Sequence, residues 1–140
     1  MGVTIRSKNY NIDMGGGDFL NLRTKVAELT TQDIYEHYKA LTNYFSCTVE
    51  EKKDFFEDYN KKIEILDEKY NGKYSDILDF LYEPDCNGNI SYDVCISLWN
   101  TIKDCEDDTK YGYVGRFVTF NDFKKIVKDC IDNKTNLTWY

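Results

Sequence analysis

Apolar residues recur every three or four positions through most of the chain, which is the spacing of one face of an α-helix. The longest such stripe lies in residues 48–70, and its members are Phe56, Tyr59, Ile63, Leu66 and Tyr70. Thr48 and Glu51 form a capping box at its start, and Asn71-Gly72 is typical of a helix end. The pattern predicts a long helix that either buries this stripe in its own core or forms a dimer seam.

Shorter stripes, most of them preceded by an N-cap residue, predict further helices. They cover residues 18–29, 30–45, 75–82, 91–102 and 119–130. Val3–Ser7 predicts one short strand, and residues 103–117 predict an irregular segment. We therefore expect a mainly α fold, with α+β as the alternative: a single compact domain over residues 1–140, with five or six helices and a short N-terminal β segment.

Composition agrees with a folded single domain. The chain has 140 residues, of which 41% are hydrophobic and 16% aromatic, and this excludes a disordered chain. No apolar run approaches the ~20 residues that a membrane span needs. The net charge of −7 argues against binding nucleic acid by bulk electrostatics. An acidic surface suits a protein partner, although solubility alone also explains it.

Cysteine and histidine usage points away from a metal or cofactor site. Five cysteines without a C-x-x-C pair, together with a single histidine, do not form a recognisable zinc motif. Cys95 and Cys130 fall on apolar stripes, where a reduced thiol behaves as a small core residue. Because the chain also begins without a signal-peptide pattern, we expect a cytoplasmic protein without a cofactor.

Residues 83–91 resemble an EF-hand loop between two predicted helices. Asp85, Asn87 and Asn89 are the candidate oxygen donors. Val94 stands where a bidentate Glu should close the calcium shell. We therefore expect an EF-hand-like helix–loop–helix corner that lacks a full ligand set, and no metal.

A run of three glycines precedes the first predicted helix, where backbone N–H groups can cradle an anion. The candidate ligand- or partner-binding residues here are Gly15, Gly16, Gly17, Asp18 and Arg23. The run matches neither the G-x-G-x-x-G fingerprint nor a P-loop. A turn before an N-cap at Asp18 explains it equally well.

Tyr111, Tyr113 and Arg116 are crowded into one glycine-containing segment. Such a loop can stack a base, clamp a phosphate or anchor a protein interface. An aromatic loop folded over the core is the alternative. These three residues complete the candidate binding set.

No catalytic constellation is apparent. His37 is the only histidine, and no Ser or Cys can be placed beside it from the sequence. A solvated or hydrogen-bonded histidine explains it as well as a general base does. Cys47 precedes a predicted helix but has no identifiable base. The pattern therefore favours a protein that is not an enzyme.

Several segments share a pattern with a known group. They are Met1–Ile5, Ile12–Gly15, Val26–Leu29, Asp79–Tyr82, Asp85–Gly88 and Tyr111–Arg116. Together they resemble a family of small uncharacterised proteins from Firmicutes and their mobile elements. The resemblance covers nearly the whole chain and implies no activity and no site residue.

Two functional hypotheses follow from the sequence. The first is a non-enzymatic accessory or regulatory factor that binds another protein. The alternative is a domain, with enzymatic activity left open, that binds a phosphate-bearing small molecule or nucleotide through Gly15–Gly17 and Arg116. The alternative requires these two segments to be adjacent in space.

Overall fold

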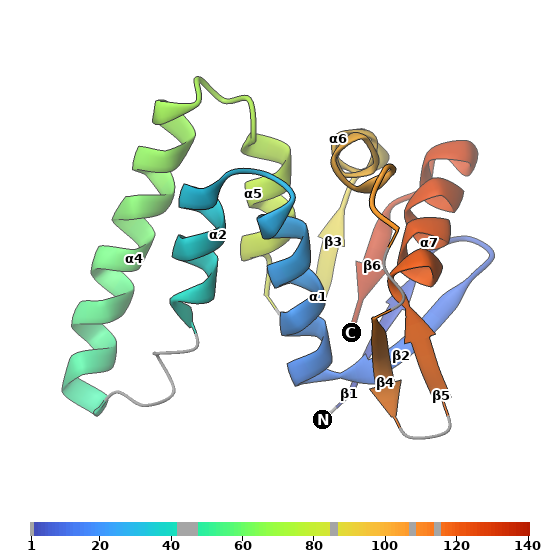
Figure 1. Ribbon diagram of the computed structural model, residues 1–140, viewed down its shortest axis with the longest axis horizontal. Helices are drawn as coiled ribbons and strands as arrows, with labels where there is room; N and C mark the ends of the chain where they lie inside the picture. Colours follow the sequence, from blue (N-terminus) through green and yellow to red (C-terminus); the bar gives the residue numbers. More distant parts are fainter. Residues whose placement is uncertain (1, 42–47, 85–86, 107–108, 114–115) are drawn as a thin grey trace.

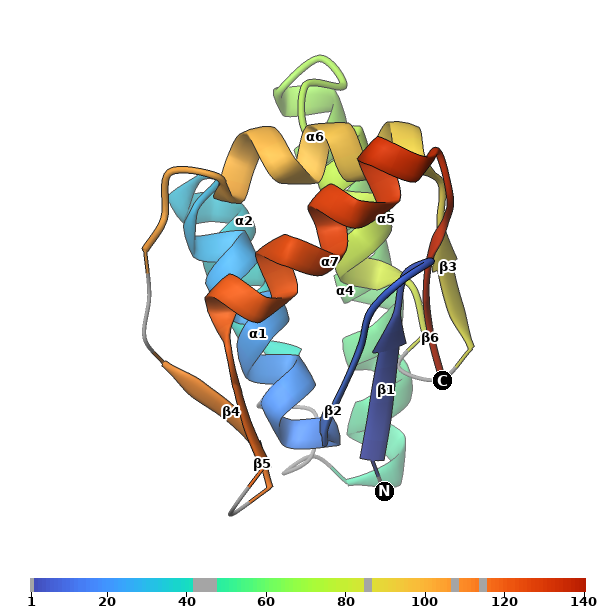
Figure 2. The same ribbon diagram turned by 90° about the vertical axis from the view of Figure 1, so that its right-hand side faces the viewer.

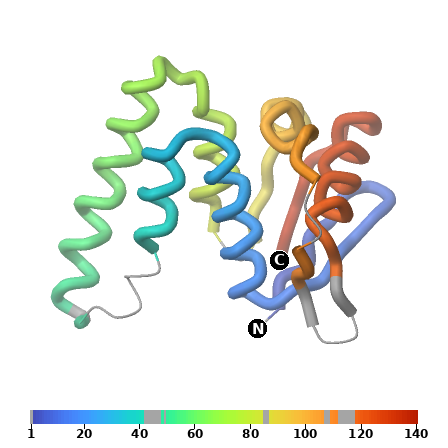
Figure 3. The backbone as a smooth tube through the Cα atoms, viewed as in Figure 1, coloured from blue at the N-terminus to red at the C-terminus, as the bar shows by residue number. Residues whose placement is uncertain are grey.

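Six helices and two antiparallel sheets make up the described part of the chain (Figure 1). The structure is a computed structural model that describes residues 2–41, 48–84, 87–106, 109–113 and 116–140 (Figure 3). The helices are α1 (Gly16–Glu28), α2 (Gln32–Lys39), α4 (Val49–Lys69), α5 (Ser75–Tyr82), α6 (Tyr92–Ile102) and α7 (Phe120–Asn133). The strands are β1 (Gly2–Arg6), β2 (Asn11–Gly15), β3 (Gly88–Ile90), β4 (Lys110–Tyr113), β5 (Arg116–Thr119) and β6 (Leu137–Trp139).

The larger sheet has the strand order β2-β1-β6-β3, so the last strand of the chain lies in its interior. Successive side chains alternate between its two faces, as strand geometry requires. The buried face carries Val3, Ile5, Ile12, Met14, Ile90, Leu137 and Trp139. Helices α1 and α7 cover this face (Figure 2), and the core lies between the two layers.

This architecture corrects the expected mainly α fold to α+β. The predicted N-terminal strand is present as β1, but it is one of six described strands. Residues 110–113 and 116–117, expected to be irregular, form the β4–β5 hairpin together with Val118 and Thr119. The other five strands were missed because each has only three to five residues, and β3 and β6 also depend on distant partners, such as Ile5 opposite Trp139. So short a segment carries too little periodic pattern of its own.

The helix boundaries follow the local capping signals closely. The Thr48 hydroxyl accepts a hydrogen bond from the Glu51 N–H at 3.2 Å, and the Glu51 carboxylate accepts one from the Thr48 N–H at 3.0 Å. Thr119 and Asp122 form the same reciprocal pair at the start of α7, and the Ser91 hydroxyl accepts a hydrogen bond from the Val94 N–H at the start of α6. Past the end of α4, Asn71 and Gly72 have positive φ angles of 53° and 74°. These ends were predictable because capping depends on neighbours in sequence.

The glycine run differs from its expected role. Helix α1 begins at Gly16, and Gly15 is its N-cap. Asp18 is therefore the third helical residue rather than the cap, and its carboxylate accepts a long hydrogen bond of 3.4 Å from the Gly15 N–H. The end of the second predicted helix, residues 42–45, lies outside the described residues.

The EF-hand-like corner contains a strand that joins the large sheet. Ile90 pairs with Leu137 of β6, while Asn87 occupies a left-handed turn with φ 58°. Asn89 is exposed on β3, and Asp85 lies outside the described residues. Within the described ranges, no three His, Cys, Asp or Glu side chains gather closely enough to hold a metal ion. The segment is therefore a strand followed by an N-capped helix, and the EF-hand-like corner stays a prediction.

Helix α4 lies at one edge of the molecule, beside α2 and α5 and away from the large sheet (Figure 1). Side-chain interactions attach the C-terminal end of α4 to α2 and α5. Asp33 of α2 pairs with Lys69 and accepts a hydrogen bond from the Tyr70 hydroxyl at 3.0 Å. Ser75 donates to Asp67 at 2.5 Å. None of the helices in the described ranges is both long and apolar enough to cross a membrane.

Candidate functional site

A cavity of about 550 Å³ lies between α1, α2, α4 and α5, and we call it the central cavity. Most of its wall is apolar. The apolar side chains are Leu20, Leu41, Phe56, Ile63, Leu81 and Pro84. Pockets that hold small molecules have volumes of about 300–1,000 Å³ and a mostly apolar lining with a few placed polar groups. The central cavity has both properties.

Three tyrosines from three different helices supply polar groups to this wall. Tyr38 comes from α2, Tyr59 from α4 and Tyr82 from α5. The Tyr59 and Tyr82 rings meet edge to face at 5.7 Å, and those of Tyr38 and Tyr82 are tilted at 5.8 Å. These are favourable arrangements of aromatic quadrupoles, so the rings position one another.

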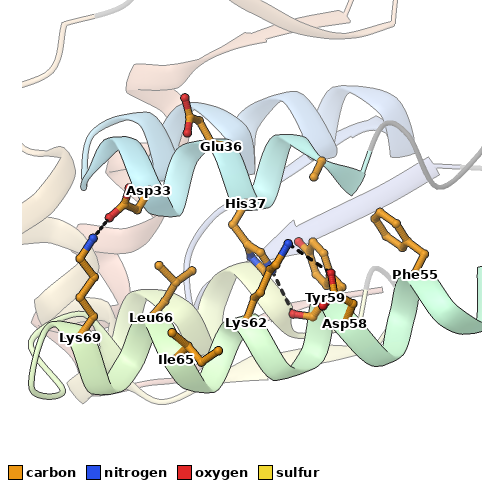
Figure 4. A pocket seen from close by; sticks show the side chains of 11 residues that line it. Asp33, Glu36, His37, Phe55, Asp58, Tyr59, Lys62, Ile65, Leu66 and Lys69 are labelled. Atoms are coloured by element: carbon orange, nitrogen blue, oxygen red, sulfur yellow. Dashed lines mark hydrogen bonds and ion pairs between the residues drawn. The ribbon is translucent and has the colours of Figure 1, made fainter.

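His37 connects Tyr59 and Tyr82, and Figure 4 shows its contact with Tyr59. Its Nε2 lies 3.0 Å from the backbone carbonyl oxygen of Tyr59, and its Nδ1 lies 2.6 Å from the Tyr82 hydroxyl. A carbonyl oxygen can only accept, so Nε2 carries the hydrogen of the neutral imidazole. Nδ1 then accepts the hydrogen of the Tyr82 hydroxyl. The imidazole also stacks on the Tyr59 ring, with centroids 3.9 Å apart.

Burial keeps this cluster uncharged at neutral pH. It lowers the pKa of His37 below its usual value, and it raises the pKa values of Tyr59 and Tyr82 above theirs. For Tyr59, the neighbouring Tyr82 adds to the rise. The cluster therefore offers neutral hydrogen-bonding groups at the edge of an apolar space, and proton transfer at pH 7 is disfavoured.

The Tyr59 hydroxyl differs from the other polar atoms of the cluster. It is buried, and it makes no hydrogen bond to any residue that the structure describes. Most buried polar groups in proteins do have a partner. This hydroxyl is therefore a hydrogen-bonding group left available beside the cavity.

A second, shallower space lies on the other side of Tyr59, between α2 and α4, and we call it the α2–α4 groove (Figure 4). Its volume is about 440 Å³, and its floor includes Ala40, Phe55 and Leu66. Charged side chains form its rim, where Lys62 pairs with Asp58 at 3.2 Å. The groove is thus more polar at its edges than the central cavity.

Part of the predicted binding set lines the central cavity. Gly16, Gly17 and Arg23 all border it. Arg23 is nevertheless only 2% exposed, and its guanidinium lies 4.3 Å from the centroid of the Phe19 ring. It also donates a weak hydrogen bond of 3.5 Å to the Pro84 carbonyl oxygen. Arg23 is therefore held within the core and contributes to the cavity wall.

Two further members of the predicted set lie on another face of α1. Asp18 and Tyr111 border a separate space of about 380 Å³ between α1 and β4. Tyr111 is only 4% exposed and is a core residue. The side chains of Tyr113 and Arg116 lie outside the described residues. Helix α1 thus separates Gly16 and Gly17 from Tyr111, so these described members of the set do not share one space. Whether Arg116 lies near the glycine run stays a prediction.

Sequence reasoning missed the histidine–tyrosine cluster. Tyr38 and Tyr59 were assigned to apolar helix faces, and His37 could be given no partner. One local signal was present, because a tyrosine in a buried stripe brings a hydroxyl that needs a partner, unlike Leu or Ile. The partner itself is remote, since Tyr82 is 45 residues from His37.

Comparison of the chain with protein-family models, curated proteins and solved structures finds no match. The resemblance to a Firmicutes family therefore stays a prediction. The function has to be argued from the site itself.

Proposed function

We propose that the protein is a non-enzymatic binding protein that holds a small, mostly apolar molecule in the central cavity. The observation that carries this proposal is a space of about 550 Å³ walled by four helices. The space opens to the surface, where Phe56 in its lining is 39% exposed. An open, mostly apolar pocket of this size is typical of sites that hold a small molecule.

The character of the polar groups favours binding over catalysis. His37 uses both ring nitrogens in hydrogen bonds within the protein, and its pKa is lowered by burial. A general base needs a free nitrogen within reach of the substrate and a pKa near the working pH. Here the histidine instead orients Tyr82 at the cavity wall.

The shape of the space favours a small molecule over a peptide helix. A docked helix needs a long open trough that accepts several turns. The central cavity has walls on four sides, with Leu20 on α1, Ile63 on α4 and Leu81 on α5. Gly16 and Gly17 widen one side because they contribute no side chain. A compact ligand fits such an enclosure.

The test uses N-phenyl-1-naphthylamine, an uncharged apolar dye that fluoresces strongly away from water. We expect saturable binding to the wild-type protein. Ile63→Trp places a large ring in the central cavity and is expected to weaken binding at least about tenfold, since it removes the space for the dye. Ile65→Trp is the matched control, because Ile65 lies on the same helix but borders the α2–α4 groove.

Circular dichroism establishes that each variant is folded. Loss of binding in Ile63→Trp alone would support the proposal. Absence of saturable binding to the folded wild-type protein would contradict it. An equal loss in both variants would place the dye outside the central cavity and would also contradict it.

Binding of another protein is a second candidate function, and the β4–β5 hairpin supports it. The two strands extend away from the helices at one end of the molecule (Figure 2). The buried Tyr111 anchors the hairpin to the core. We expect affinity purification to recover one stoichiometric partner that is lost in a folded Tyr113→Ala, Arg116→Ala variant. Recovery of the bare chain would argue against this function.

A further inference from the structure

The Tyr59 hydroxyl is a polar atom at the cavity for which the described residues supply no hydrogen bond of good geometry, although Tyr59 is only 5% exposed. Leaving a buried hydroxyl unpaired costs about 1–3 kcal/mol of folding free energy. The neighbouring Tyr82 raises the pKa of Tyr59, while the hydrogen of the Tyr82 hydroxyl is donated to His37. A ligand can supply a well-placed acceptor for the Tyr59 hydrogen.

Resting on the proposed function, we propose that the ligand carries an uncharged hydrogen-bond acceptor, such as a carbonyl oxygen, on its apolar frame. The Tyr59 hydroxyl donates to this acceptor. The inference therefore names both the chemical class of the ligand and the residue that selects it.

The position of the hydroxyl supports this assignment. The ring of Tyr59 stacks on His37 in the wall between the two spaces. Its phenol interacts electrostatically with those of Tyr82 and Tyr38. Both of these tyrosines border the central cavity and neither borders the α2–α4 groove. The hydroxyl of Tyr59 therefore lies on the side of the central cavity.

The surroundings of the hydroxyl favour an acceptor without charge. The groups nearest to it are phenols and a neutral imidazole, each kept uncharged by burial. A charged group brought to this end of the cavity would lose its hydration without gaining a counter-ion from the cluster. A carbonyl or ether oxygen loses much less and gains the hydrogen bond.

The attachment of α4 bears on how a ligand reaches an atom that is sealed from water. The C-terminal half of α4 is tied to α2 through Asp33 and to α5 through Ser75. Tyr59 lies in the other half, where it packs on the rings of Phe55 and His37. For a ligand to meet the hydroxyl, the Tyr59 side chain has to move relative to these rings, while the His37 contact with the Tyr59 carbonyl holds the backbone of this half to α2.

The experiment compares two probes of nearly the same shape. Benzophenone has a carbonyl group where diphenylmethane has a methylene, so only benzophenone can accept a hydrogen bond. The dissociation constants of both are measured, by displacement of the dye, for the wild-type protein and for Tyr59→Phe. We expect the substitution to reduce the preference for benzophenone about threefold to tenfold. The preference is the ratio of the two dissociation constants. The difference in hydrophobicity between the probes affects this ratio equally in both proteins, so it cancels when the ratios are compared.

Thermal unfolding supplies a second measurement that is independent of ligand. Tyr59→Phe removes an unpaired hydroxyl, so its Tm should equal or exceed that of the wild type. Tyr82→Phe also removes a tyrosine hydroxyl, but this hydroxyl donates a hydrogen bond to Nδ1 of His37. The substitution therefore leaves Nδ1 without a donor. Its Tm should fall by about 3–6 °C.

Each outcome separates this inference from the proposed function. Absence of saturable dye binding would overturn both. Dye binding that neither probe displaces would overturn the inference alone. Binding of both probes with a preference that Tyr59→Phe does not change would overturn the inference alone. A Tm loss in Tyr59→Phe as large as that in Tyr82→Phe would show that the hydroxyl already has a partner, and would overturn it too.

Discussion

At the scale of single residues, the main feature is a histidine whose two nitrogens are used for structure. His37 sits between Tyr59 and Tyr82 with 9% of its surface exposed. Because the Tyr59 carbonyl fixes one nitrogen as a donor, the other can only accept. Protonation would place a second hydrogen on Nδ1 and turn the Tyr82 hydroxyl away.

The pKa of His37 should therefore lie below its usual value of 6.5, because burial disfavours the charged imidazole. His37 is the only histidine, so its imidazole proton signals can be followed by NMR through a pH titration without overlap. We expect a midpoint clearly below 6.5. A midpoint at or above that value would show that the imidazole is hydrated, and the cluster would not exist as described.

The same shift determines how stability depends on pH. Below pH 6.5 the unfolded chain binds a proton at His37 that the native state still excludes. The free energy of unfolding should thus decrease as pH falls from 6.5 toward the native pKa. The His37→Gln variant should lack this decrease in the free energy of unfolding. The difference in Tm between pH 7.5 and pH 5.5, measured for the variant and the wild type, tests this expectation.

At the scale of secondary-structure elements, the helices were predictable and most strands were not. Thr48 and Glu51 specify the start of α4 within four residues of sequence. Strand β3 has only three residues, and it exists because Gly88 and Ile90 lie opposite Trp139 and Leu137. Nothing close to Gly88 in sequence supplies this pairing, so the same segment was interpreted as part of a degenerate calcium loop.

Gly88 is required in β3 because the indole of Trp139 fills the place of a side chain. A Cβ at this position would lie 1.9 Å from Trp139 Cε2. The indole cannot shift easily, since it is buried and donates a hydrogen bond of 2.8 Å to the Pro84 carbonyl oxygen. We expect Gly88→Ala to destabilise the fold by about 3 kcal/mol or more, measured by urea unfolding.

Gly17→Ala provides the control for this prediction. A Cβ at Gly17 meets no atom within 4 Å, and the residue lies in the first turn of α1. Alanine should therefore leave stability unchanged or raise it by up to about 1 kcal/mol. Equal destabilisation by the two substitutions would show that loss of glycine flexibility, rather than the indole, causes the effect.

At the scale of the whole molecule, the fold depends on contacts between the two ends of the chain. Strand β6 pairs with β1 on one side and with β3 on the other. The central cavity also combines distant segments, since Gly16, Tyr59 and Pro84 belong to three separate parts of the sequence. The candidate site could not be predicted as a unit for this reason. Periodicity identified the helices that surround it but not which faces meet.

The position of β6 makes the last four residues essential for folding. Leu137 and Trp139 are 0% and 1% exposed, and burying a large apolar side chain contributes about 2–5 kcal/mol when measured by truncation. Their joint loss is comparable with the whole stability of a typical domain, about 5–15 kcal/mol. Deletion of residues 137–140 should therefore abolish the cooperative thermal transition seen by circular dichroism.

Tyr140→Ala is the control, because this side chain is exposed while the backbone of residue 140 pairs with Thr4. It should change stability by less than about 0.5 kcal/mol. A cooperative transition in the truncated chain, within a few degrees of the wild type, would mean that the interior strand of the large sheet is dispensable.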